Sequence, residues 1–111
     1  MKYLCLVYLD QENWSACPDA NCAGYAQALT ASGQLLAGEA LQPIQTATSL
    51  RVRNGQLSMT DGPFAETKEL LAGFWMLEAR DLNEAIRLAS EIPSAKYGTI
   101  EVRPVRALAV P

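Results

Sequence analysis

Asp61 is the residue whose type and setting best suit acid–base chemistry. It ends an alternating segment, Gln56 to Asp61, and precedes Gly62–Pro63, a dipeptide that forces a turn. In strand phase Asp61 shares a face with Leu57 and Met59. If that face is covered, the carboxyl lies at the lip of an apolar cavity, where desolvation makes it a usable general acid or base. The alternative is that Asp61 accepts hydrogen bonds from the amides of residues 63–66 and only holds the turn.

Glu39 is the second candidate, within LLAGEAL at 35–41. Strand alternation predicts that it shares an apolar face with Leu35, Ala37 and Leu41. A buried carboxylate usually has a partner, and the available cations are Arg51, Arg53 and Arg103, so a structural ion pair is the simpler interpretation. If Glu39 instead meets Asp61, the two like charges couple and their proton affinities separate.

Four further residues are candidates for ligand binding. Lys68 lies in the charged loop 62–71 and can close over a pocket as an anion clamp, although such a loop is usually only solvated. Arg103 and Arg51 can hold a substrate's negative charge. Tyr8 is a candidate aromatic contact, and packing in the core or at a dimer interface is the alternative for it.

Composition excludes several kinds of site. The 111 residues contain no histidine, which removes Ser-His-Asp and Cys-His nucleophile systems and every histidine-containing metal site. The sequence shows no glycine-rich phosphate loop, metal-ligand motif or cofactor fingerprint, so we expect no cofactor and no metal. A net charge of −3 lacks the basic surplus that phosphate backbones attract, so no direct nucleic-acid partner is expected.

The cysteines and the hydropathy pattern bear on location. Cys5 lies in an apolar run and is expected to be a small buried hydrophobe. Four residues separate Cys17 from Cys22, so these two cysteines can at most form a local disulfide bridge in an oxidising compartment. No apolar stretch approaches the roughly 20 residues of a membrane span, and no signal peptide is recognisable. We therefore expect a cytoplasmic protein with three free thiols.

Periodicity predicts two helices and six strands. Helical spacing and stop signals indicate helices at 18–32, ended by Gly33, and from Asp81 to Pro93, with Glu84 completing a capping arrangement. Trp14 is expected to anchor the first helix. Asn54–Gly55 is a strong hairpin signal. The predicted strands are 3–9, 35–41, 46–53, 56–61, 73–79 and 98–105.

This order predicts one α+β domain: a ferredoxin-like antiparallel sheet with two helices on one face and an additional hairpin. The strands 3–9 and 73–79 are apolar on both sides, and two helices cover only one face of such a sheet. The second face must be covered by something else, and a second copy is the simplest cover. A homodimer is therefore expected.

Several segments together resemble a DGPF-type member of the YCII-related family. They are MKYLCLVY, AGEAL at 37–41, TDGPFAETKE at 60–69, GFWMLEARDLNEAIRLASEIP at 73–93 and IEVRPV at 100–105. The resemblance implies a dimeric α+β barrel and a small-molecule site built around a His–Asp pair. This chain has no histidine, so only the aspartate carries over, onto Asp61. The resemblance also implies kinship with dehydrochlorinases of hydroxylated aromatics and, for DGPF-type members, association with extracytoplasmic-function sigma factors.

Two functions follow as hypotheses. The first is a dimeric accessory protein that binds a small ligand or contacts a sigma factor. The second is a cofactor-free lyase or isomerase acting on a small phenolic or anionic substrate. In the second, Asp61 moves the proton, Glu39 tunes it, and Lys68 or Arg103 holds the substrate's charge.

Overall fold

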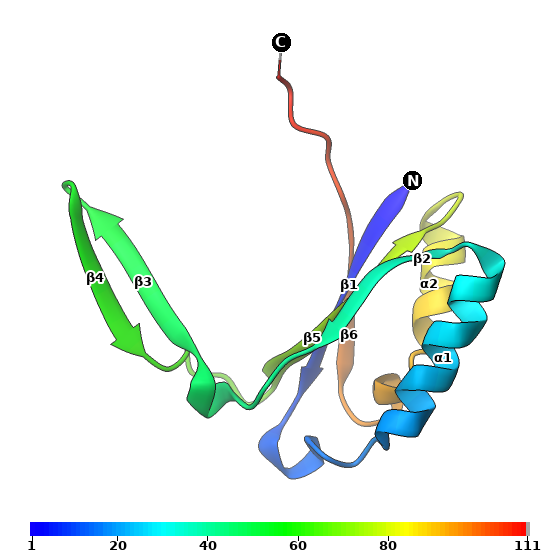
Figure 1. The fold of residues 1–111 in the computed structure, drawn as a ribbon, viewed down its shortest axis with the longest axis horizontal. Coiled ribbons are helices and arrows are strands. Elements are labelled where there is room, and N and C mark those ends of the chain that lie inside the picture. Colours follow the sequence, from blue (N-terminus) through cyan, green and yellow to red (C-terminus); the bar gives the residue numbers. More distant parts are fainter. Residues whose placement is uncertain (111) are drawn as a thin grey trace.

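The computed structural model describes residues 1–110, and its main body is an antiparallel four-stranded sheet carrying two helices. The sheet has the order β2-β5-β1-β6 and is built from β1 (Lys2–Leu9), β2 (Leu35–Ala40), β5 (Leu70–Glu78) and β6 (Thr99–Pro104). Both helices, α1 (Asp19–Ser32) and α2 (Leu82–Ser90), lie on the same side of the sheet (Figure 1). The predicted ferredoxin-like α+β arrangement is confirmed. No helix within the described residues is long and apolar enough to cross a membrane.

The core lies between the sheet and the helices. Alternate residues of β1 are buried because they point toward the helices, beginning with Tyr3 and including Cys5, which is wholly inaccessible. Leu77 on β5 and Ile92 after α2 are the largest side chains buried almost completely. Trp14 packs against this core, as expected of an anchor for α1.

Local signals fix the helix ends. The left-handed Gly33 ends α1, and its amide donates to the carbonyls of Leu29 and Thr30. The Asp81 carboxylate accepts a hydrogen bond of 2.9 Å from the Glu84 amide at the start of α2.

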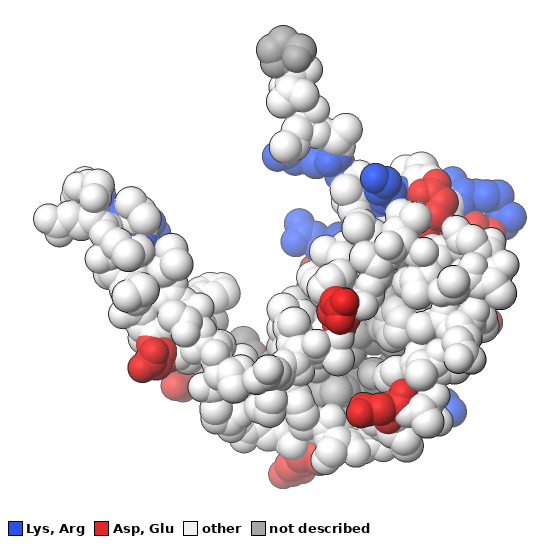
Figure 2. Space-filling model, in the orientation of Figure 1, with Lys and Arg blue, Asp and Glu red and all other residues white. Residues whose placement is uncertain are grey.

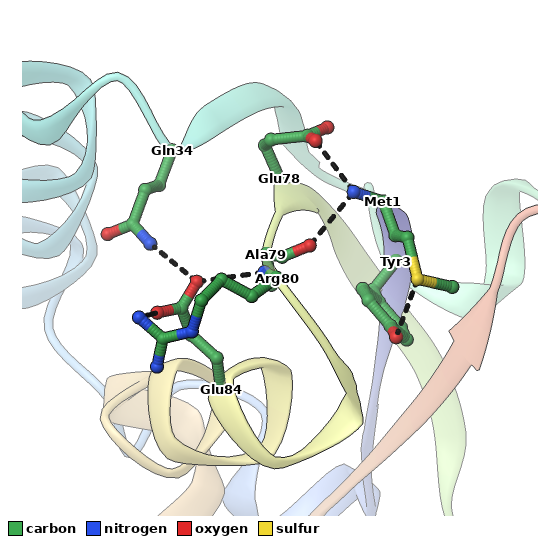
Figure 3. A network of polar contacts seen from close by, with 7 residues as sticks. All are labelled: Met1, Tyr3, Gln34, Glu78, Ala79, Arg80 and Glu84. Carbon is green, nitrogen blue, oxygen red and sulfur yellow. Dashed lines mark hydrogen bonds and ion pairs between the residues drawn. The ribbon is translucent and has the colours of Figure 1, made fainter.

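A polar network ties the start of α2 to the sheet (Figure 3). The Glu84 carboxylate accepts from the Arg80 amide at 3.0 Å and forms an ion pair of 2.9 Å with the Arg80 guanidinium. The Gln34 amide reaches the same carboxylate, while the amino group of Met1 donates to Glu78 on β5. The contacts of Gln34 and Arg80 link Glu84 of α2 to the residues that flank β2 and β5, while the Met1 contact joins the start of the chain to the end of β5.

Two bulges decide which side chains face the helices. In β2, Leu35 is opposite Leu77 but Ala37 is already opposite Met76, so Leu36 is an extra residue. In β5, Ala72 is the extra residue opposite β1. Because one extra residue reverses the alternation, Leu35 faces the helices whereas Ala37 and Glu39 face the other way. The prediction that Glu39 shares a face with Leu35 is therefore wrong.

The remaining strands form a separate hairpin, β3 (Thr48–Arg53) and β4 (Gln56–Asp61), which we call the arm. Asn54 and Gly55 both have positive φ at its turn, as the sequence predicts. The arm stands away from the four-stranded sheet and approaches it only at its base (Figure 1). β3 begins at Thr48 rather than 46 because residues 44–46 form a 3₁₀ turn, and β5 begins at Leu70 rather than 73.

Candidate functional site

A cavity of about 650 Å³, which we call the aromatic cavity, lies between α1 and the four-stranded sheet. Its walls come from the loop before α1, the first turns of α1, and the strands β2 and β5. Both tryptophans of the chain, Trp14 and Trp75, line it. In Figure 2 the surface is hollowed between α1 and the sheet, and the coloured atoms at its rim are acidic. A cavity of this volume is in the range that holds small molecules.

Packing contacts fix the aromatic wall of this cavity. The Tyr25 ring of α1 meets Trp75 edge to face, with ring centroids 5.0 Å apart. The Tyr25 hydroxyl donates a 2.8 Å hydrogen bond to the Leu88 carbonyl of α2, and burial raises the pKa of that hydroxyl. Gly38 lets the Trp75 ring lie close to β2, because a Cβ at residue 38 would be 2.9 Å from Trp75 Cε3. Trp75 is thus held between α1 and the edge strand β2.

Two acidic residues border this cavity: Asp19, at the start of α1, and Glu39, on the edge strand β2, whose side chain the register turns toward the opposite face of the sheet. No lysine or arginine lines it among the residues that the structure describes. Cys17 and Cys22 lie on the same wall as Asp19. The arrangement can accept a mainly apolar, aromatic molecule that is neutral or positively charged, and it disfavours an anion.

The two arginines predicted to bind a substrate's negative charge do not line this cavity. Arg51 is exposed on β3, on the face of the arm opposite that of Leu50 and Val52. Arg103 is exposed on β6 and lies 3.7 Å from the Glu101 carboxylate. Neither lines the cavity beside α1.

Lys68 lines a second cavity, of about 600 Å³, next to the start of β5. Three acidic residues line the same cavity: Asp10, Glu12 and Glu66. The surroundings of Lys68 are therefore acidic, and it does not face the aromatic cavity.

Asp61 lies at the base of the arm, where β4 ends. It shares a face with Leu57 and Met59, as the alternation predicts, but that face is exposed in the single chain. The condition for an apolar cavity around Asp61, a covered face, is therefore not met within the described residues 1–110. The neighbouring turn is held instead by the Gly62 amide, which donates to the Ala47 carbonyl at 2.7 Å, and by the Ser49 hydroxyl, which donates to the Gly62 carbonyl.

Glu39 and Asp61 belong to different sheets, so the single chain does not pair them. Glu39 is on the face of the four-stranded sheet that the helices leave uncovered, which we call the open face. Tyr8 and Arg103 lie on the open face too. Reasoning from the sequence did not find the aromatic cavity. Trp14 was expected to pack against the first helix, but nothing in the sequence indicates that it lines one cavity together with Trp75.

The chain matches the YCII-related domain over residues 1–109. Uncharacterized protein R00369 of Rhizobium meliloti (strain 1021) is 42% identical over 67 residues, which are 59% of this chain and 54% of that protein. The chain thus spans about half the length of this curated relative.

A solved structure with the same fold is 5-chloro-2-hydroxyhydroquinone dehydrochlorinase (TftG) from Burkholderia phenoliruptrix AC1100, in complex with 2,5-dihydroxybenzoquinone. The TM-score is 0.60 at 15% sequence identity, and the alignment covers 96% of this chain and 94% of that one. At this identity the likeness shows a shared fold.

Proposed function

Because this chain belongs to the YCII-related family and contains a cavity lined by both of its tryptophans, we propose that it is a small-ligand-binding protein. The ligand is an aromatic molecule that is neutral or cationic. The observation that carries this proposal is the cavity beside α1, with its aromatic wall and the acidic Asp19 at the start of the helix. The dehydrochlorinase of the same fold was solved in complex with 2,5-dihydroxybenzoquinone, which supports a small cyclic ligand by analogy of fold.

Three ligands of one shape test the charge preference. 2-Phenylethanol, phenethylamine and phenylacetate present the same ring with a neutral, a positive and a negative group. We expect the first two to quench or shift tryptophan fluorescence and phenylacetate to bind about threefold or more weakly, because Asp19, the charged residue on the helix side of the lining, is acidic. If phenylacetate binds best, or if none of the three binds at about 1 mM, the proposal is wrong.

Filling the cavity with a larger side chain tests whether the ligand binds there. Ala23 lines the cavity from α1, so Ala23→Phe is expected to weaken binding of 2-phenylethanol about tenfold or more by occupying the space of the ligand. Ala28→Phe is the matched control, because Ala28 is exposed on the same helix and lies outside the lining. Equal affinities for the two variants, measured by isothermal titration calorimetry, would place the ligand somewhere else.

We also propose that the protein acts as a homodimer in which the arm and the open face meet a second copy. One face of the arm is apolar and exposed: Leu50 by 62%, Val52 by 57%, Leu57 by 59% and Met59 by 66%. The open face carries further apolar side chains, among them Leu4, Leu6 and Phe74. The radius of gyration is 15.9 Å, whereas a compact chain of this length has about 13 Å. An extended arm of this kind suits contact with another copy.

Neighbouring residues of β4 provide the test of this dimer. Met59 is on the apolar face of the arm, and Ser58 is on the opposite face, paired with Arg51. We expect light scattering to give twice 12.0 kDa for the wild type and for Ser58→Glu, and a shift toward the monomer mass for Met59→Glu. A monomeric wild type, or an equal effect of both substitutions, would contradict the dimer.

The lyase or isomerase hypothesis depends on covering Asp61. In the single chain this carboxyl is exposed, so a partner that covers the apolar face of the arm is required before Asp61 can act as a desolvated acid or base. Catalysis by Asp61 and Glu39 therefore stays a prediction that depends on the dimer. Contact with a sigma factor also stays a prediction.

A further inference from the structure

Two cysteine side chains lie together at the start of α1. The Sγ atoms of Cys17 and Cys22 are 3.8 Å apart, and both side chains are half-buried. They line the aromatic cavity, on the wall that also contains Asp19. Both are free thiols.

The local backbone explains this proximity. Pro18 precedes the first residue of α1, and its φ of −63° and ψ of 140° turn the chain so that residue 17 lies beside the first helical turn. The Asn21 amide donates to the Pro18 carbonyl at 3.0 Å, which closes that turn. Cys22 follows within the same turn, so the two thiols are held near each other by the start of the helix.

We propose that Cys17 and Cys22 form a redox pair that closes to an intramolecular disulfide at the edge of the cavity when the protein meets a peroxide. A disulfide needs a sulfur–sulfur distance of about 2.0 Å, so the atoms must approach by about 1.8 Å. Rotation of one or both side chains about the Cα–Cβ bond supplies movements of this size. Cys17 lies in the loop before α1, outside regular structure, so the backbone can adjust as well.

The chemistry balances with peroxide as the oxidant. The Cys17 thiolate attacks one oxygen of hydrogen peroxide, the O–O bond breaks, and the products are a sulfenic acid and hydroxide, which takes up the proton that the thiol released. The Cys22 sulfur then attacks the sulfenic sulfur, the S–O bond breaks, and the departing hydroxide takes the Cys22 proton. In total, two thiols and one hydrogen peroxide give one disulfide and two waters.

The order of attack follows from the surroundings of each sulfur. Burial raises the pKa of the Cys22 thiol, and its contact with Cys17 raises it further, so Cys22 is the poorer first nucleophile. Cys5 provides an internal comparison, because it is wholly inaccessible and burial raises its pKa to about 11. Of the three thiols, we therefore expect two to react and Cys5 to stay reduced.

Closure of the pair would change the cavity. Trp14 and Ser15 line the cavity just before Cys17, and a bond to Cys22 ties this loop to α1. This consequence rests on the proposed ligand-binding function, whereas formation of the disulfide does not. We expect the affinity for 2-phenylethanol to differ about threefold or more between the reduced and oxidised protein.

The test uses the reduced wild-type protein and hydrogen peroxide. We expect the intact mass to fall by about 2 Da, two thiols to be lost, and dithiothreitol to restore both. In Cys22→Ser the Cys17 sulfenic acid has no resolving partner, so dimedone should label it. In Cys17→Ser the slower Cys22 should react several-fold less with dimedone.

The outcomes separate the redox pair from the ligand site. Oxidation that adds oxygen to the wild type without loss of hydrogen, or that links two copies through these cysteines, would overturn the redox pair. A disulfide that forms in a protein to which 2-phenylethanol binds in neither state would support the pair and contradict the proposed function. Binding of 2-phenylethanol without formation of any disulfide would support the proposed function and contradict the redox pair.

Discussion

Gly98→Ala is expected to destabilise the protein by about 3 kcal/mol or more. A Cβ at residue 98 would be 2.0 Å from the carbonyl oxygen of Tyr8 and 2.7 Å from Leu9 Cδ2. Tyr8 belongs to β1, which is hydrogen-bonded on both sides in the sheet, so its carbonyl cannot move away without breaking pairs with its neighbours. The clash must be relieved by displacing the start of β6.

Gly24→Ala is the matched control for this substitution. Gly24 lies inside α1, and a Cβ there would meet nothing within 4 Å. Because alanine has a higher helix propensity than glycine, we expect this variant to be more stable than the wild type by about 0.5–1 kcal/mol. Urea unfolding of both variants at one protein concentration measures the two changes. If they have the same sign, the steric account of Gly98 is wrong.

Leu77→Ala is expected to cost about 3 kcal/mol or more of unfolding free energy. Leu77 has no accessible surface, and it lies between Tyr3 on β1 and Leu35 on β2. Truncation removes apolar contacts and leaves a cavity in the middle of the sheet, which backbone pairs on both sides prevent from collapsing.

Leu82→Ala is the comparison for Leu77. Leu82 is 48% exposed at the start of α2, so the same change in side chain should cost about 1 kcal/mol or less. The free energies of unfolding, measured at the same protein concentration, should therefore differ several-fold between the two variants. Comparable losses would mean that the packing at Leu77 is looser than its burial implies.

Much of the fold was predictable because its signals are local. Asn54–Gly55 specifies a hairpin turn by its backbone preferences alone, and Asp81 specifies the start of α2 through a bond to the Glu84 amide. The apolar run of β1 specifies a central strand, since both of its faces need cover. The strand order follows from these elements and from the usual connections of a two-helix α+β sheet.

The site was less predictable because it depends on spatial relations. Alternation placed Glu39 with Leu35, but the extra residue Leu36 separates them onto opposite faces, and no composition signal marks a bulge. Alternation placed Asp61 correctly beside Met59, yet it cannot show whether that face is covered within one chain. The aromatic cavity unites Trp14 and Trp75 from distant parts of the chain, which only tertiary packing reveals.

The bulge at Leu36 decides on which surface Glu39 places its charge. If every residue of β2 paired in simple alternation after Leu35, Ala37 instead of Gly38 would lie opposite Trp75, and Glu39 would turn toward the helices. Because the extra residue Leu36 takes up one position, the carboxylate stays on the surface available to a second copy, and the Trp75 ring keeps a bare backbone beside it. Deleting Leu36 would remove the bulge and leave the faces of Gly38 and Glu39 as they are. Related chains with one residue fewer here are therefore expected to keep the same charge on both surfaces and to pair β2 with β5 without a bulge.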